Sequence, residues 1–221
     1  YGLPVSEIDH RGATTTYVYD SVFLYPVSIT DALGHTTNIT YDYRFGTPIQ
    51  TMDANGFVTE TTRDGFGRII SEKASSPSGA LDTRATYSCV DTLGALSKTA
   101  TVYFTSTTSR ESVEYYDGLK RVIQTKEKGN DTLWNTKDFV YDASGNLASE
   151  SLLYKDTSRD RSTPNAPTAL VLTHTYDALG RSTADITVLG TTTTAYTDWT
   201  QTKTDALGYV KKYEQDAFGN L

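Results

Sequence analysis

Aspartate recurs every eleven residues through the first part of the chain, at Asp20, Asp31, Asp42, Asp53 and Asp64. Most of these aspartates open a short unit of the form Asp-x-x-Gly. The units are Asp31–Gly34, Asp42–Gly46 (one residue longer), Asp53–Gly56, Asp64–Gly67, Asp91–Gly94, Asp142–Gly145, Asp177–Gly180, Asp205–Gly208 and Asp216–Gly219. A fixed period is typical of a repeat architecture, in which each unit packs on its neighbours. The repeat therefore constrains the shape of the molecule more than its chemistry.

The repeated unit has the composition of a tight turn. Its Asp can accept hydrogen bonds from backbone N–H groups two residues on, and its Gly can adopt the left-handed conformation that closes a hairpin with a bulge. The segments between turns, such as 35–41 and 57–63, are rich in Thr, Tyr, Val and Ile, which favour strands. Seven residues of strand and four of turn account for the period. The pattern predicts an antiparallel β-meander of repeated hairpins.

Composition favours an open sheet over a densely packed sandwich. Hydrophobic residues make up only 37% of the 221 residues, whereas Tyr occurs 16 times. A sandwich would need more Val, Leu and Ile on its inner faces. No segment keeps a 3.6-residue apolar period over ten residues, so no helix is expected. We predict an all-β chain whose sheet is elongated and curved or spiralling.

Several function classes are disfavoured by charge and residue usage. The net charge is −7 with Lys and Arg scattered, which argues against nucleic-acid binding. No apolar run is long enough for a membrane helix. Cys89 is the only cysteine, and His10, His35 and His174 lack a second His or Cys at ligand spacing. No catalytic, metal-binding or cofactor-binding residue is therefore predicted, and the chain is expected not to be an enzyme.

Three stretches can be separated along the chain. Residues 1–74 hold the regular eleven-residue repeats, and residues 75–110 hold diverged repeats that begin with a flexible loop signal at Ser75–Gly79. Residues 111–221 hold repeats with inserted loops, of which the polar, Pro-bearing insert Asp156–Pro167 is interpreted as an exposed hairpin tip. All three are expected to form one continuous array, cut from a longer protein.

A tyrosine precedes the turn aspartate in several units, as in Tyr19-Asp20, Tyr41-Asp42, Tyr116-Asp117, Tyr141-Asp142 and Tyr176-Asp177. Such units resemble the Tyr-Asp repeat of the RHS/YD-repeat family, which reads roughly Tyr-Asp-x-x-Gly-Arg-Leu followed by a Thr-rich strand. The segment 114–154 looks most like the B component of insecticidal toxin complexes and SpvB-type proteins. Two units depart from the pattern: Lys120 stands at the glycine position after Asp117, and Phe23 stands there after Asp20.

The resemblance implies a long β-sheet that spirals into a hollow shell around a toxic cargo polypeptide. Relatives are secreted or surface-exposed bacterial toxin and virulence proteins, and animal teneurins use a similar barrel for adhesion. The expected partners are the rest of the repeat array and the enclosed toxin polypeptide, with host-surface carbohydrate or protein as further candidates. The Asp-Pro-x-Gly self-cleavage segment of the family has no match here, so autoproteolysis is not carried over.

Two kinds of residue remain open to more than one interpretation. The repeated carboxylates could suggest calcium or acid–base chemistry, but each sits where it would cap a turn, and Asp53–Gly56 supplies too few oxygen ligands for a calcium loop. The tyrosines could stabilise the sheet through cross-strand pairs or present aromatic faces to sugars and polypeptides. We predict a structural segment of a toxin-encapsulating β-shell; the alternative is an adhesin or binding module with Tyr-lined faces.

Overall fold

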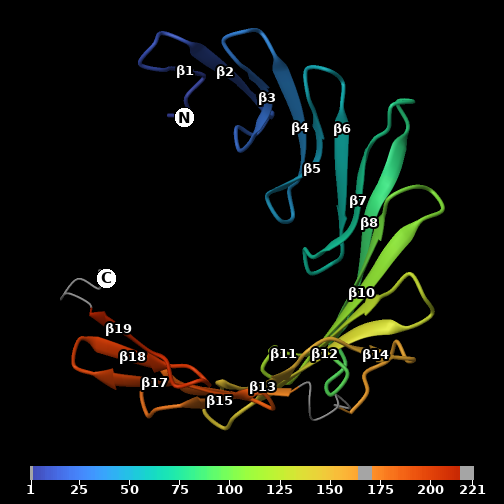
Figure 1. Cartoon of the computed structure of the whole chain (residues 1–221). Helices are drawn as coiled ribbons and strands as arrows, with labels where there is room; N and C mark the ends of the chain where they lie inside the picture. The colour runs from blue at the N-terminus through green and yellow to red at the C-terminus, as the bar shows by residue number, and fades with distance from the viewer. Residues whose placement is uncertain (1, 164–170, 215–221) are drawn as a thin grey trace. The chain divides into compact units, whose positions relative to one another are not determined.

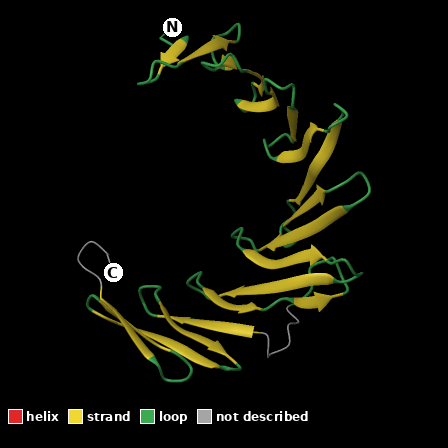
Figure 2. Cartoon of the chain, turned by 45° about the horizontal axis from the view of Figure 1, so that its top comes forward, coloured by secondary structure: helices red, strands yellow, loops and turns green. Residues whose placement is uncertain are grey.

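The computed structural model describes residues 2–163 and 171–214, and in this part of the chain all regular structure is β-strand (Figures 1 and 2). The strands are β1 (Ser6–Ile8), β2 (Thr14–Tyr19), β3 (Pro26–Thr30), β4 (Thr36–Asp42), β5 (Thr47–Met52), β6 (Val58–Arg63), β7 (Ile69–Ser75), β8 (Leu81–Val90), β9 (Ser97–Tyr103), β10 (Ser109–Tyr116), β11 (Val122–Lys128), β12 (Trp134–Tyr141), β13 (Leu147–Ser151), β14 (Tyr154–Asp156), β15 (Val171–Tyr176), β16 (Ser182–Thr187), β17 (Gly190–Thr197), β18 (Thr200–Thr204) and β19 (Val210–Glu214). The predicted all-β fold is confirmed.

The chain divides into two compact units. Unit 1 comprises Tyr1–Ser88 and Ala100–Arg110, and unit 2 comprises Cys89–Thr99 and Glu111–Leu221. In unit 1, consecutive strands from β1 to β8 pair in antiparallel fashion. In unit 2, antiparallel pairs join β10 to β11 and β12, and join β15 in order to β19. Each unit is therefore the meander that the eleven-residue period predicts.

The two edges at which the chain reverses differ in geometry. At every second turn the register of the strand pair shifts by one residue just before the aspartate, as between Val18 and Tyr19 or between Thr175 and Tyr176. We call this edge the bulged rim; its turns begin at Asp20, Asp42, Asp64, Asp117, Asp142 and Asp177. The opposite edge, the plain rim, has unshifted pairs such as Thr30 with Thr36. In the bulged units, tyrosine occupies the bulge position at all but Asp64, where Arg63 replaces it.

The turn conformation survives where glycine is missing. Gly34, Gly56 and Gly208 have φ of 84°, 77° and 86°, in the left-handed region that suits glycine. Lys120 and Phe23 adopt φ of 62° and 58° at the same place in their turns. The surrounding hydrogen bonds thus impose the left-handed residue even on side chains that disfavour it.

The loop signal at residues 75–79 is a hydrogen-bonded turn of the same class. Gly79 N–H donates to Ser76 O at 2.9 Å, and Ser76 N–H donates to Ala80 O at 2.8 Å. Gly79 has φ of 82°. Ser76 therefore takes the place of the turn aspartate, and Gly79 belongs with the turn glycines.

Unit 2 contains a branch in the strand order. The first half of β12 pairs with β14 through Trp134 to Thr136, whereas its second half pairs with β13 through Phe139 to Tyr141. Strand β13 then pairs with β15. The interpretation of the insert from Asp156 as a hairpin tip is wrong for its described part, because β14 and β15 join different neighbours and are not the arms of one hairpin. Residues 157–161 are exposed, as expected, but they are anchored to the sheet beneath them.

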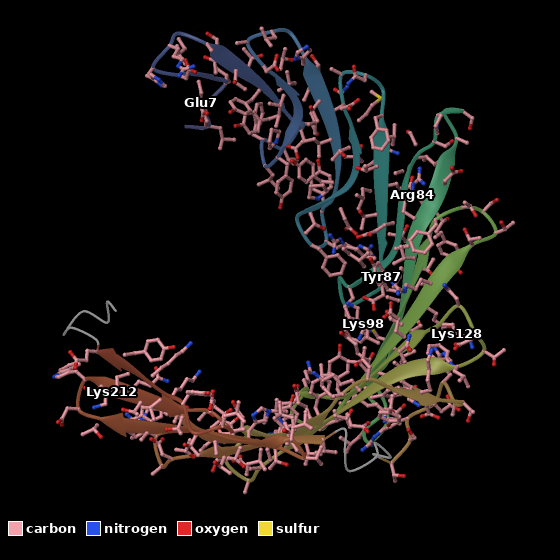
Figure 3. The ribbon with its side chains drawn as sticks, in the orientation of Figure 1. Glu7, Arg84, Tyr87, Lys98, Lys128 and Lys212 are labelled. Atoms are coloured by element: carbon pink, nitrogen blue, oxygen red, sulfur yellow. The ribbon has the colours of Figure 1, made fainter. Side chains whose placement is uncertain are left out.

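Apolar packing is local. The buried apolar cluster of the described residues consists of Val113, Tyr115 and Trp134, with Ile123 packed against it. Elsewhere the side chains stand on the two sides of the strands and contact neighbouring strands, as where the Tyr87 hydroxyl donates to Glu72 Oε2 at 3.2 Å (Figure 3). Residues 2–163 and 171–214 include no helix long and apolar enough to span a membrane.

Substitution of a turn glycine tests the left-handed conformation. Gly56→Ala should lower the free energy of unfolding by about 1 kcal/mol, since an L side chain costs about 1–2 kcal/mol there and the stiffer unfolded chain returns part of it. A Cβ would meet nothing within 4 Å at Gly56, so no steric clash contributes. The measurement is chemical denaturation of both proteins.

Gly65 provides the control, because its Cβ would also meet open space and its φ is not positive. Gly65→Ala should leave stability unchanged or raise it slightly. Equal losses at Gly56 and Gly65 would contradict the conformational explanation.

Candidate functional site: the repeat turn and its joints

The turn aspartate organises each unit through one carboxylate oxygen. In the Asp117 turn, Oδ1 accepts hydrogen bonds from the N–H groups of Leu119 and Arg121, both at 2.9 Å. The backbone closes the same loop, because Lys120 N–H donates to Asp117 O at 3.1 Å and Asp117 N–H donates to Arg121 O at 3.0 Å. The turns at Asp31, Asp53, Asp177 and Asp205 repeat this arrangement. Four residues are thereby held by one carboxylate and its own backbone.

The second carboxylate oxygen binds the side chain at the fifth position of the unit. Arg121 Nε and Arg181 Nε lie 2.7 Å from Asp117 Oδ2 and Asp177 Oδ2. The pKa of Asp117 lies below its usual range, first because the Arg121 backbone N–H donates to the carboxylate and then, against the effect of burial, because the Arg121 guanidinium does so too. The carboxylates are thus held as anions by partners within their own turns.

The arginine also reaches the next turn on the bulged rim. The Arg121 guanidinium lies 4.4 Å from the ring centroid of Tyr141, and that of Arg181 lies 4.3 Å from the ring centroid of Tyr196. A cation over an aromatic face contributes about 0.5–1 kcal/mol at exposed sites. The Asp–Arg ion pair orients the guanidinium for this contact, so one repeat is tied to the next.

Tyrosine hydroxyls supply a second tie. Tyr141 donates to Val122 O at 3.0 Å, Tyr176 to Leu147 O at 2.9 Å and Tyr196 to Ser182 O at 3.0 Å. Each acceptor belongs to the residue that pairs with the bulged tyrosine of the preceding unit, as Val122 pairs with Tyr116. A bulge disrupts the ladder of strand hydrogen bonds locally. The next tyrosine therefore binds a carbonyl beside that disruption. We call the combined Arg and Tyr contacts the joint between repeats.

The remaining repeat tyrosines have other partners. The Tyr19 hydroxyl donates to Pro4 O at 3.0 Å, and the Tyr116 hydroxyl donates to Glu114. The Tyr41 ring stacks on Tyr25 with the centroids 4.7 Å apart.

The predicted turn residues fall where the pattern places them, apart from two that lie outside the described residues. Gly34, Gly46, Gly56, Gly67, Gly94, Gly145, Gly180 and Gly208 all have positive φ. Asp42 and Asp64 pair with Arg44 and Arg68, and Asp142 accepts a hydrogen bond from the Asn146 side chain. Asp216 and Gly219 are the two residues outside the described part.

Sequence reasoning missed a buried polar cluster beside the branch in unit 2. The Lys126 side chain is 0% exposed, and its Nζ lies 2.6 Å from Asp156 Oδ2 and 2.8 Å from Ser158 O. Gln124, on the same face of β11, donates from Nε2 to Asp138 Oδ1 at 2.7 Å and to Ser162 O at 3.2 Å. These bonds anchor residues 156–162 to the sheet. The only sequence signal was the run of polar residues at alternate positions of these strands.

The electrostatics of the cluster follow from this burial. Burial acts to raise the pKa of Asp156, but hydrogen bonds from the Lys126 ammonium, the Ser158 N–H and the Ser162 hydroxyl outweigh it and lower the pKa to about 2. Lys126 is thereby the positive charge that permits a carboxylate in this place. The cluster works as an anchor for the inserted loop, since its polar groups bind one another.

The histidines lie in local pairs. His35 Nδ1 is 2.9 Å from Asp31 Oδ2, within a turn, and His174 Nδ1 is 2.7 Å from Asp185 Oδ1, between paired strands. No group of three or more His, Cys, Asp or Glu side chains that could hold a metal is found in residues 2–163 and 171–214.

Comparison with known proteins identifies the fold. No family model matches the sequence, and no curated protein matches it. The crystal structure of TcdB2-TccC3 superposes with a TM-score of 0.69 at 21% identity over 87% of this chain. The crystal structure of TcdB2-TccC3-Cdc42 does so with a TM-score of 0.73 at 17% identity, again over 87%. This chain has the fold of part of TcdB2-TccC3.

The similarity confirms the resemblance to toxin-complex proteins at the level of the fold. The chain spans 12% and 15% of the lengths of the two TcdB2-TccC3 chains that it matches. At these identities the TcdB2-TccC3 match establishes architecture and does not transfer residue roles. The joints described above are observed in this chain itself.

The tyrosine joint can be tested by removing one hydroxyl. Tyr141→Phe should lower the free energy of unfolding by about 1 kcal/mol, because the Val122 carbonyl loses its hydrogen bond while ring packing is kept. Tyr209→Phe is the control, since Tyr209 is 70% exposed. Denaturant titration of both variants measures the difference, and equal values would rule out a role for the hydroxyl.

The buried cluster gives a larger expected effect. Lys126→Ala should destabilise the protein by about 3–5 kcal/mol, the cost of breaking a buried ion pair. Lys155→Ala removes an ion pair of similar length to Asp131, 3.0 Å, in which both side chains are 49% exposed. That control should cost about 1 kcal/mol or less. Thermal and chemical unfolding would contradict the anchor if both losses were small.

Proposed function

We propose that the chain is a structural, non-enzymatic segment of a secreted or surface-exposed toxin-type protein, in which it forms part of a β-shell around a cargo polypeptide. The observation that carries the proposal is the joint: the Arg121–Tyr141 and Arg181–Tyr196 contacts, with the tyrosine hydroxyl bonds, tie each repeat to the next at one rim. The fold shared with TcdB2-TccC3 supports it.

A sheet held at its turns suits enclosure for a physical reason. Each added hairpin brings its own turn cap and its own joint, so the sheet can lengthen without a second layer to pack against. Twist and bulges curve such a strip as it lengthens. The volume enclosed can then grow with few additional buried apolar side chains.

The proposed partners follow from this role. One is the remainder of the repeat array, which would continue the same pairing and joints. The other is a toxic polypeptide held within the enclosed volume. The carboxylates of the repeat are used as turn caps, which supports a role in architecture rather than in acid–base chemistry.

The proposal can be tested with the full-length secreted protein that carries this segment. We expect its cargo polypeptide to resist an added protease, and the double variant Arg121→Ala/Arg181→Ala to expose the cargo, because two joints open. His35→Ala is the matched control: it removes a turn ion pair that has no aromatic partner in the next turn.

The outcomes separate the two candidate functions. A cargo that is cleaved as fast in the unaltered protein as after denaturation would overturn encapsulation. Binding of the unaltered protein to a glycan array, with no protected polypeptide, would favour the adhesin instead.

A further inference from the structure

The tips of the turns carry large apolar side chains that face solvent. On the bulged rim, Phe66, Leu119 and Leu179 are 82%, 75% and 78% exposed. Each stands at the third position of its turn, two residues after the aspartate. Turn tips are normally small or polar, and a row of exposed apolar residues marks an interaction surface.

The plain rim carries the same kind of side chain. Leu33, Leu189 and Leu207 are 81%, 91% and 84% exposed. Leu33 and Leu207 lie in the tetrapeptide Asp-Ala-Leu-Gly, which also contains Leu179 on the bulged rim. The two rims therefore present matching apolar tips at positions that the repeat itself specifies.

Charge at the bulged rim does not oppose a close approach. The Asp64, Asp117 and Asp177 carboxylates each lie 2.7 Å from an arginine of the same turn, Arg68, Arg121 or Arg181. Because each charge is compensated within its own turn, a second rim can approach without strong like-charge repulsion. The apolar tips are then the main feature that such a partner would meet.

Spacing narrows the choice of partner. Turns on one rim are two strands apart, so their tips recur about every 10 Å along the edge, given about 4.8 Å between paired strands. The opposite rim of such a sheet has the same repeat distance and the same side chains. A strip that winds on itself as a spiral meets its own next layer only through opposite rims.

We propose that the bulged rim of one stretch of array docks on the plain rim of another through these turn tips, and that for this chain the partner is a second copy. The inference rests on the proposed shell, because the same contact would join successive layers of a wound strip. It is heterologous, so in solution it adds copies one after another without closing.

Three proteins test the contact by sedimentation velocity over a range of concentrations. The unaltered 221-residue chain should form a concentration-dependent series of oligomers. The bulged-rim variant Phe66→Ser/Leu119→Ser/Leu179→Ser and the plain-rim variant Leu33→Ser/Leu189→Ser/Leu207→Ser should each be monomeric, because each lacks one half of the contact. Circular dichroism should show the same β-sheet spectrum for all three.

Mixing the two variants gives the decisive result. The bulged-rim variant keeps an intact plain rim and the plain-rim variant keeps an intact bulged rim, so an equimolar mixture should form dimers and nothing larger. A monomeric unaltered chain, continued association of either variant alone, or a mixture that stays monomeric would overturn the proposal. Association through open strand edges, for example, would persist in both variants.

This test is independent of the cargo experiment. A monomeric chain together with a protease-protected cargo would overturn the rim contact and leave encapsulation standing. Rim association with an unprotected cargo would do the reverse.

Discussion

The hydrogen bonds accepted by one aspartate carboxylate are the interaction on which the rest of this structure depends. In the turn at Asp117, one oxygen holds the N–H groups of Leu119 and Arg121 while the other holds the Arg121 guanidinium. This arrangement is strong enough to keep Lys120 in the left-handed region. Because the carboxylate fixes both the chain reversal and the direction of the arginine, turn geometry and repeat-to-repeat contact have a single origin.

Stability in such a sheet is distributed over many small contributions. A tyrosine hydrogen bond and a guanidinium–ring contact each supply on the order of 1 kcal/mol, and both recur from one repeat to the next. The cluster around Lys126 and Trp134 is different, since burial there is deep and local. It lies where β12 divides its pairing between β13 and β14, a place where the regular joints are interrupted and the inserted segment must be fixed by other means.

The architecture separates three tasks on different parts of the strip. The strands supply area, the bulged turns supply connection along the strip, and the exposed tips supply the proposed contact between layers. The arginine serves two of these tasks. It joins one repeat to the next through Tyr141 or Tyr196, and it compensates the carboxylate that would otherwise oppose a second rim. The Asp-x-x-Gly-Arg pattern can therefore be understood as a local structural requirement of a sheet that also contacts itself.

The sequence by itself determined the strands, the turns and their alternation, because these depend on contacts within about five residues, such as Asp31 with Leu33 and His35. It also indicated the toxin-complex fold through the Tyr-Asp units. Only the tertiary structure showed that Tyr141 bonds to Val122, that the segment after Asp156 is anchored through Lys126 and Gln124, and that Leu33 and Leu179 stand on opposite rims. These features join residues far apart in the chain, and their partners depend on strand register and on the branch at β12, which no local pattern encodes.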